Sequence, residues 1–257
     1  MASQPISILI TGANRGLGLE MVEQILQASQ PVKQLFACCR DPDGPQAEAL
    51  RTLAKKHADV VSIVRLDASD LRSIRRATQR VGAALPPGGL NLLINNAAVL
   101  PRGGLQTTSP EDMQSALHTN VLGPANIIKE FLPLLRAAVR AGGRAGMSCR
   151  QAAVVNISAF LGSFPSIEET YDFLPAISYR MSKAALNMLT LCASTELKRD
   201  GILVAALHPG WVRTDMGTQE ADIDARESVE GMLDVVFSLN EKDTGTFLNY
   251  KGKVIGW

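Results

Sequence analysis

The stretch that decides the fold is Pro5-Ile-Ser-Ile-Leu-Ile10, which runs directly into Thr11-Gly-Ala-Asn-Arg-Gly-Leu-Gly18. The β-branched run predicts a buried parallel strand, and a helical pattern begins at Leu19, directly after the glycines. A strand, a glycine-rich turn and a helix in this order form the unit that holds a phosphate group at a helix N-terminus. The stretch therefore predicts an α/β fold that binds a dinucleotide.

The glycine loop has the spacing G-x-x-x-G-x-G. Because glycine has no Cβ, the backbone can turn tightly and approach a pyrophosphate, whose charge the helix N-terminus favours. The alternative is a tight strand-to-helix turn that binds nothing. We expect the cofactor to contact Gly12, Asn14, Arg15, Gly16, Leu17 and Gly18.

Seven predicted strands alternate with helices, with only loops between them. This pattern predicts a single doubly wound Rossmann domain over residues 1–257, with a roughly seven-stranded parallel sheet and helices on both faces. Ligands bind across the carboxyl ends of such strands. The polar clusters of the sequence all stand at predicted strand ends: the glycine loop, Arg40, Asp67, Asn95-Asn96, Ser158 and Pro209-Gly210.

The second predicted strand, Val32 to Cys39, ends directly before Arg40. The end of this strand is where a dinucleotide-binding fold distinguishes NAD from NADP: an acid accepts from the ribose 2′-hydroxyl, whereas an Arg accommodates a 2′-phosphate. Arg15 in the glycine loop would supply a second guanidinium to the same phosphate. We therefore expect NADP (NADPH). In the alternative, Asp41 is the ribose acid and Arg40 is a solvated surface residue.

The stretch from Ser178 to Leu191 predicts a helix, within a helical segment of about 176–199. Tyr179 and Lys183 stand four residues apart, so one turn of helix places them on the same face. A Lys ammonium beside a phenol lowers the pKa of the Tyr below its ordinary value of about 10, which suits proton transfer near neutral pH. A surface Lys near a half-buried Tyr is the alternative.

Composition excludes several classes of function. Apolar residues make up 46% of the chain and charged residues 20%, and the net charge of +1 points neither to nucleic acid nor to a membrane surface. No apolar run is long enough to span a bilayer. The four cysteines lack metal or redox spacing, which indicates free thiols in a reducing compartment, and we expect a cytoplasmic protein. The three histidines are scattered, so no metal site is expected.

The chain resembles the short-chain dehydrogenase/reductase family over essentially its full length. The family's T-G-x-x-x-G-x-G stands at residues 11–18, its N-N-A-G at 95–98 and its P-G-x-x-x-T at 209–214. Its active-site Asn, Ser, Tyr and Lys match Asn120, Ser158, Tyr179 and Lys183. Within the family, the glycine loop and the segment Gly-Trp-Val-Arg-Thr-Asp-Met-Gly are similar to the C-factor and sniffer-type carbonyl reductases.

The resemblance implies hydride transfer between a nicotinamide and the carbonyl carbon of a small-molecule ketone or aldehyde. Tyr179 would give the proton, Lys183 would lower the pKa of Tyr179 and hold the ribose, and Ser158 would donate to the carbonyl oxygen. Asn120 would hold a water, although an Asn in a helix can also simply bond to backbone. Further cofactor contacts are expected at Asp67, Ala68, Asn96, Ala97, Pro209, Gly210, Val212 and Thr214, besides Tyr179 and Lys183.

The sequence departs from the family's pattern at two places. Ala98 replaces the last glycine of N-N-A-G, which would cost on the order of 1 kcal/mol if the position needs a positive φ. The interval of 21 residues from Ser158 to Tyr179 is long for the family, and its aromatic residues predict a loop, 160–175, that covers the pocket and favours apolar or aromatic carbonyls. In the alternative, these aromatics are ordinary core.

Helix 176–199 also has apolar side chains nearly all round, so we expect it to be fully buried, partly in a homodimer against helix 121–141. Two other functions stay open. One is a cofactor-binding sensor or signalling protein with little catalysis, although all four active-site residues are present. The other is an NAD-dependent alcohol or steroid dehydrogenase, which depends on the roles of Arg40 and Arg15.

Overall fold

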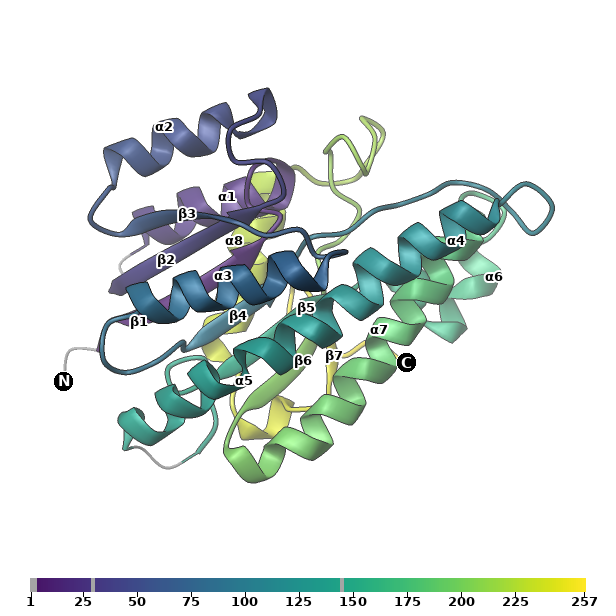
Figure 1. The fold of residues 1–257 in the computed structure, drawn as a ribbon. Helices are drawn as coiled ribbons and strands as arrows, with labels where there is room; N and C mark the ends of the chain where they lie inside the picture. Colours follow the sequence, from purple (N-terminus) through teal and green to yellow (C-terminus); the bar gives the residue numbers. More distant parts are fainter. Residues whose placement is uncertain (1–3, 29–30, 144–145) are drawn as a thin grey trace.

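The computed structural model describes residues 4–28, 31–143 and 146–257 (Figure 1). In this part of the chain a seven-stranded sheet, parallel throughout, has the strand order β3-β2-β1-β4-β5-β6-β7. The order reverses at β1, so that the carboxyl ends of β1 and β4 flank the crevice in which such folds bind their ligands. The strands are β1 Ile6–Thr11, β2 Val32–Cys39, β3 Val61–Arg65, β4 Leu92–Asn95, β5 Ala153–Ile157, β6 Leu203–His208 and β7 Phe247–Asn249.

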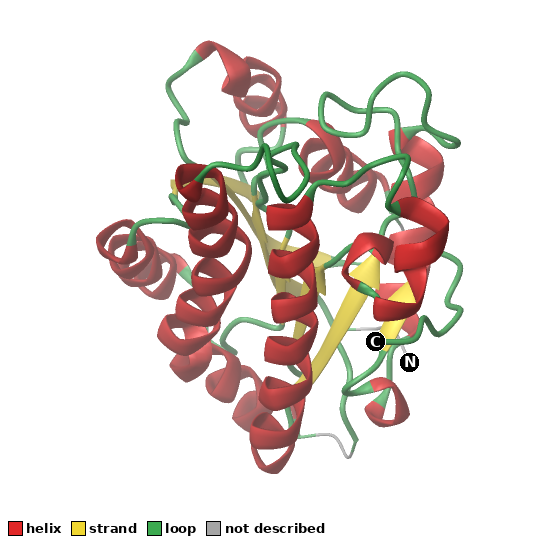
Figure 2. Cartoon of the chain, turned by 90° about the vertical axis from the view of Figure 1, so that its right-hand side faces the viewer, coloured by secondary structure: helices red, strands yellow, loops and turns green. Residues whose placement is uncertain are grey.

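Helices cover both faces of the sheet, as the sequence predicts (Figure 2). Successive residues of a strand point to opposite faces, and in β1 Ile8 and Ile10 join one core cluster while Leu9 joins the other. The first cluster packs under α1 (Gly16–Gln27), α2 (Glu48–Lys56) and α8 (Ala225–Ser238). The second packs under α3 (Leu71–Ala84), α5 (Gly123–Gly142) and the end of α7 (Ile177–Leu197). No helix in the described ranges has the length and hydropathy to cross a membrane.

Local sequence rules explain the shorter α4, Pro110–Leu117. Ser109 accepts a hydrogen bond from the Asp112 backbone N–H, and Asp112 accepts one from the Ser109 N–H, which completes a capping box. Pro110 occupies the first helical position, where its missing N–H costs nothing. The sequence Ser109-Pro110 therefore begins this helix.

The segment 160–175, predicted as a loop, contains short helices instead. Two single turns of 3₁₀-helix cover Phe160–Gly162 and Phe164–Ser166, and α6 covers Ile167–Thr170. The hydroxyl of Ser163 bonds to the Gly256 carbonyl, so that the last residues of the chain hold one end of this segment. Its turns are too short to show a hydrophobic period, which is why the sequence does not reveal them.

Helix α7 buries its polar face, whereas its composition predicts that apolar side chains are buried. Its buried residues are mainly polar, among them Ser178, Arg180, Ser182, Asn187, Thr190 and Ser194, whereas Met181, Met188 and Leu191 are exposed. The expectation of apolar side chains nearly all round is wrong for the buried face, while the burial of the exposed side chains in a homodimer stays a prediction. The polar face is inside because it bonds to polar residues on β5 and in the site, for example Thr190 to Asn156.

Candidate active site

The glycine loop forms a cradle in which Gly12 and Gly18 have no room for a side chain. Gly12 and Gly16 adopt φ values of +64° and +53°, which glycine alone adopts without strain. A methyl group on Gly18 would overlap the carbonyl oxygen of Gly12. The Asn96 side chain braces the turn from β4 by donating to the Thr11 and Gly12 carbonyls at 2.9 and 3.2 Å. This open backbone at the start of α1 suits a pyrophosphate.

The other residues of the loop, and those that close over it, have distinct roles. The Asn14 amide donates to the Gln46 carbonyl at 3.4 Å, and Leu17 packs on the core. From the far end of the chain, the Thr214 methyl group lies 3.8 Å from the position of a Cβ on Gly16. The segment after β6 therefore folds back over the glycine loop.

The two arginines predicted to share a phosphate lie in different settings. Arg15 is ion-paired with Asp215 at 2.7 Å, because the segment after β6 brings that carboxylate to the glycine loop. Arg40 directly follows β2, as predicted, and its exposed guanidinium has no hydrogen-bond or ion-pair partner among the described residues. Asp41, the alternative ribose acid, lies 3.5 Å from Arg65. The convergence of Arg15 and Arg40 on one phosphate therefore stays a prediction, and of the two guanidiniums only that of Arg15 has a partner in the described part of the chain.

The remaining predicted cofactor residues line the carboxyl edge of the sheet. One oxygen of Asp67 accepts from the N–H and hydroxyl of Ser69 at 2.9 and 2.7 Å, which fixes the turn after β3. Ala97 donates its N–H to the Thr11 hydroxyl. Ala68 and Val212 are buried, Gly210 has a φ of +88°, and the Pro209 carbonyl accepts from Ser228. Ala98 does not adopt a positive φ, so the strain considered for it is absent.

Tyr179 and Lys183 lie on the buried face of α7, one turn apart. The ammonium of Lys183 is 5.5 Å from the centre of the Tyr179 ring and donates to the Ile157 carbonyl, at the end of β5, at 2.7 Å. Burial raises the pKa of the Tyr179 phenol and lowers the pKa of Lys183 to about 7. The expected lowering of the Tyr179 pKa is therefore wrong for the protein by itself, because loss of solvation on burial disfavours the charged phenolate.

Ser158 follows β5 and meets α7 at a residue that the sequence analysis missed. Its hydroxyl donates to Oδ1 of Asn187 at 2.6 Å, and both side chains are buried. The Asn187 amide in turn donates to the Gly162 carbonyl at 3.3 Å. Asn187 stands four residues after Lys183, and this spacing could have placed it on the same face of the helix from the sequence alone.

Asn120 lies in a π-helical turn, His118–Leu122, between α4 and α5. Such turns are frequent at functional sites. Its side chain accepts from the Val99 N–H at 2.9 Å and donates to the Val99 carbonyl and to the Ser182 hydroxyl at 2.8 and 2.9 Å. The Asn120 side chain therefore bonds to backbone, as in the alternative, and it joins the segment after β4 to α7.

His208, the last residue of β6, is a second residue that the sequence analysis passed over. Its Nδ1 accepts from the Phe160 N–H at 3.2 Å. Burial and the nearby charge of Lys183 lower the pKa of His208 to about 4. The ring is therefore neutral near pH 7 and carries its proton on Nε2.

Arg180, next to Tyr179, holds the end of segment 160–175. Its guanidinium donates to the carbonyls of Leu174 and Pro175 at 2.8 Å each and to the Thr170 hydroxyl at 2.9 Å. These bonds support Ala176, whose φ of +34° is unusual for a residue with a Cβ. The start of α7 is thus held by Arg180 in a strained turn just before Tyr179.

The aromatic residues of segment 160–175 do not all belong to the core. Phe164 and Phe173 are 75% and 65% exposed, so the core alternative is wrong for these two. The Phe173 ring meets Trp211, on the segment after β6, edge to face at 5.1 Å. Segment 160–175 and the segment after β6 therefore meet through an aromatic contact.

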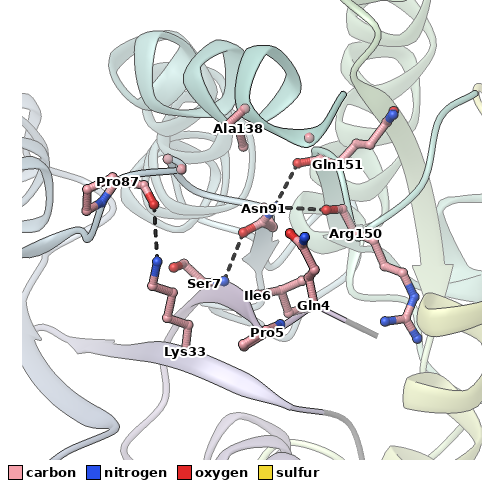
Figure 3. A pocket seen from close by; sticks show the side chains of 14 residues that line it. Gln4, Pro5, Ile6, Ser7, Lys33, Pro87, Asn91, Ala138, Arg150 and Gln151 are labelled. Atoms are coloured by element: carbon pink, nitrogen blue, oxygen red, sulfur yellow. Dashed lines mark hydrogen bonds between the residues drawn. The ribbon is translucent and has the colours of Figure 1, made fainter. Parts of the chain in front are cut away.

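A small cavity of about 100 Å³ lies at the opposite end of the sheet, where β1, β2 and β4 begin (Figure 3). Asn91 is its central side chain: it accepts from the Ser7 N–H at 2.9 Å and donates to the carbonyls of Arg150 and Gln151. None of the predicted site residues lines it. These contacts tie β1, β4 and β5 together at their amino ends, and the cavity has no part in the site.

The fold and the site define a class of protein. A family model described as short chain dehydrogenase matches residues 7–224. The chain therefore belongs to the short-chain dehydrogenase family.

Within this family, the chain is similar to several individual proteins. The NADPH-bound carbonyl reductase from chicken fatty liver is 44% identical, with a TM-score of 0.93 over 99% of this chain and 100% of that one. Carbonyl reductase Sniffer of D. melanogaster is 35% identical with a TM-score of 0.92 over the same shares. The C-signal protein of Myxococcus xanthus is 37% identical over 66% of this chain and 94% of its own length. An uncharacterised oxidoreductase of Schizosaccharomyces pombe is 32% identical over 96% of each chain.

Proposed function

We propose that this protein is an NADPH-dependent carbonyl reductase that converts a ketone or aldehyde to an alcohol, with residues 1–257 forming one NADP-binding domain. The observation that carries the proposal is the meeting of Ser158, Tyr179 and Lys183 at the end of β5, on the edge of the sheet that also holds the glycine cradle. The likeness to two carbonyl reductases, one of them NADPH-bound, supports it.

The chemistry follows from the side chains. The cofactor, when bound, supplies the hydride. Tyr179 gives its hydroxyl proton to the carbonyl oxygen as negative charge develops there. Lys183 uses one N–H for the Ile157 carbonyl and has two left, for the ribose hydroxyls and for the phenolate that Tyr179 becomes. Ser158 supplies the second hydrogen bond to the carbonyl oxygen.

A panel of carbonyl compounds, followed at the NADPH absorbance, tests the proposal. Turnover of ketones or aldehydes is the expected result. The competing function is a signalling protein, which the likeness to C-signal favours. NADPH binding without turnover of any carbonyl would support that function instead.

Arg40 is proposed as the residue that holds the 2′-phosphate of NADP. An Arg–phosphate contact contributes about 1.5–3 kcal/mol, so Arg40→Ala is expected to weaken NADPH binding about 10- to 100-fold and to leave NADH binding unchanged. Fluorescence titration with both cofactors measures this. Arg140→Ala removes an equal charge from the remote end of α5 and serves as the control. An unchanged ratio of the two affinities would remove the assignment of Arg40 and favour the NAD-dependent dehydrogenase.

Segment 160–175 is proposed to favour apolar or aromatic carbonyls through Phe173. Its exposed ring, next to Trp211, is available to a ligand, and burying a Phe side chain contributes about 1.5–3 kcal/mol. Phe173→Ala is expected to raise KM for bulky aromatic ketones about tenfold, with little effect on small aldehydes. Phe164→Ala, at the other end of the segment, is the control, and equal effects of both substitutions would contradict the proposal.

The exposed side chains of Met181, Met188 and Leu191 form one stripe on α7, spaced at three and seven residues. Such a stripe is unusual on a surface that meets only water, and we propose that it belongs to a homodimer interface. Met188→Glu is expected to convert the dimer to a monomer in light scattering, because it would bury an unpaired charge. Lys55→Glu, at an exposed position of α2 outside the expected α5–α7 interface, controls for the change of charge, and a wild-type monomer would refute the interface.

We also place the protein in the cytoplasm. All four cysteines are unpaired, and Cys38, Cys39 and Cys149 are buried. Free thiols of this kind are typical of reducing compartments.

A further inference from the structure

Helix α7 carries a third polar residue in line with the catalytic pair. Tyr179, Lys183 and Asn187 follow one another at intervals of four, so they lie on one face of the helix. All three are buried, with exposed fractions of 7%, 2% and 3%. The mechanism above uses the first two and leaves Asn187 unexplained.

The hydrogen bonds of Asn187 fix the orientation of its amide. A backbone carbonyl can only accept, so the side-chain atom facing the Gly162 carbonyl at 3.3 Å must be the NH₂ group. The oxygen of the amide then faces Ser158 at 2.6 Å. Because an amide oxygen can only accept, the Ser158 hydroxyl must donate to it.

The position of Ser158 is set from two sides. Its backbone N–H donates to the Leu207 carbonyl at 2.8 Å, as a continuation of the β5–β6 pairing. Its hydroxyl donates to Asn187 in a short bond within a buried site, where hydrogen bonds are stronger than in water. The strand therefore places the Ser158 backbone, and α7 places its hydroxyl oxygen.

We propose that Asn187 is a positioning residue for carbonyl reduction, which acts only through Ser158. This inference rests on the proposed function and refines its site. Asn187 holds the oxygen of Ser158 beside Tyr179 and Lys183, and its amide oxygen accepts the hydrogen bond of the Ser158 hydroxyl when no carbonyl competes for it. Because a hydroxyl has a single O–H, Ser158 donates its hydrogen bond to the carbonyl oxygen only in exchange for the bond to Asn187.

A double-mutant cycle in the full-length protein tests this role. Asn187→Ala is expected to lower kcat about tenfold, with KM and the NADPH Kd changed by less than about twofold. In the Ser158→Ala background the same substitution should change kcat by less than about twofold, since the residue through which it acts is gone. Equal losses in both backgrounds, or an unchanged kcat in the single variant, would overturn the proposal.

Two further variants separate this role from a loss of packing. Ser194→Ala removes a buried hydroxyl whose hydrogen bond, within the described part of the chain, goes to the Leu191 carbonyl of the same helix, and should leave kcat unchanged. Asn187→Leu fills the same space without hydrogen bonds. If Asn187→Ala fails to bind NADPH, Asn187→Leu takes its place in the double-mutant cycle.

A spectroscopic measurement is independent of the proposed function. In protein labelled with ¹⁵N-asparagine, the side-chain signal of Asn187 is identified by its loss in the Asn187→Leu variant. It should move in Ser158→Ala and stay in place in Ser194→Ala. If no carbonyl is reduced but this shift occurs, the proposed function fails and the contact stands; if the shift is absent, the Asn187 proposal fails whatever the activity.

Discussion

Replacing Tyr179 with phenylalanine is expected to abolish carbonyl reduction and to leave NADPH binding intact. The substitution removes only the hydroxyl, which makes no hydrogen bond to the described part of the chain, and keeps the ring that packs against Ala159 and Ala176. Proton donation by a positioned side chain contributes about 10²- to 10⁴-fold to a rate, and kcat should fall by at least this much. Initial rates followed at the NADPH absorbance give kcat, and fluorescence titration gives the cofactor affinity.

The control for this substitution is Tyr250→Phe, which deletes the same atom from a tyrosine directly after β7, whose hydroxyl pairs with the exposed Lys251. Its kcat should match that of the wild type. Substantial activity in Tyr179→Phe would mean that another group donates the proton. The mechanism proposed above would then be wrong, while the fold and the family would be unaffected.

The second large effect is expected from Gly18→Ala. The added methyl group would overlap the Gly12 carbonyl and approach the Asn96 amide at 2.7 Å. A backbone atom cannot move aside without displacing the glycine loop, and overpacking of this kind costs about 1–3 kcal/mol or more. NADPH affinity should therefore fall about 10- to 100-fold or more, which isothermal calorimetry measures.

Gly82→Ala is a matched control for Gly18→Ala. Gly82 lies in α3 and is exposed, and a methyl group there would meet only the Leu134 side chain at 3.7 Å. Because Ala is a better helix former than Gly, this variant should be more stable by about 0.5–1 kcal/mol and bind NADPH normally. Normal NADPH binding by Gly18→Ala would show that the cofactor does not use the glycine cradle.

Much of the fold could be predicted because it depends on local patterns. The bounds of β2, Val32–Cys39, follow from a run of strand-forming residues and match the structure. The common face of Tyr179 and Lys183 follows from helix geometry alone. The position of Ser158 at the end of β5 follows from the strand that leads to it. In each case a few neighbouring residues contain the necessary information.

The features that escaped prediction depend on residues far apart in the chain. Asp215 reaches Arg15 across 200 positions, and no local pattern reveals that ion pair. The pKa of Tyr179 depends on how completely other segments exclude water from it, so a nearby Lys was a poor guide. The contacts of Asn120 with Val99 and Ser182 were equally hidden, because they join three separate elements.

The inward-facing polar side of α7 determines how accurately the helix is aligned with the sheet. Hydrophobic contacts have no direction, so a helix with an apolar face can slide or rotate slightly at little cost. Hydrogen bonds do have direction, and α7 is joined at successive levels through Ser182, Asn187 and Thr190 to Asn120, Ser158 and Asn156. A shift of one residue would leave all three pairs unmade in a buried layer, at about 1–3 kcal/mol for each unsatisfied group. The helix thus has one permitted register, and Tyr179 takes its place relative to β5 from that register.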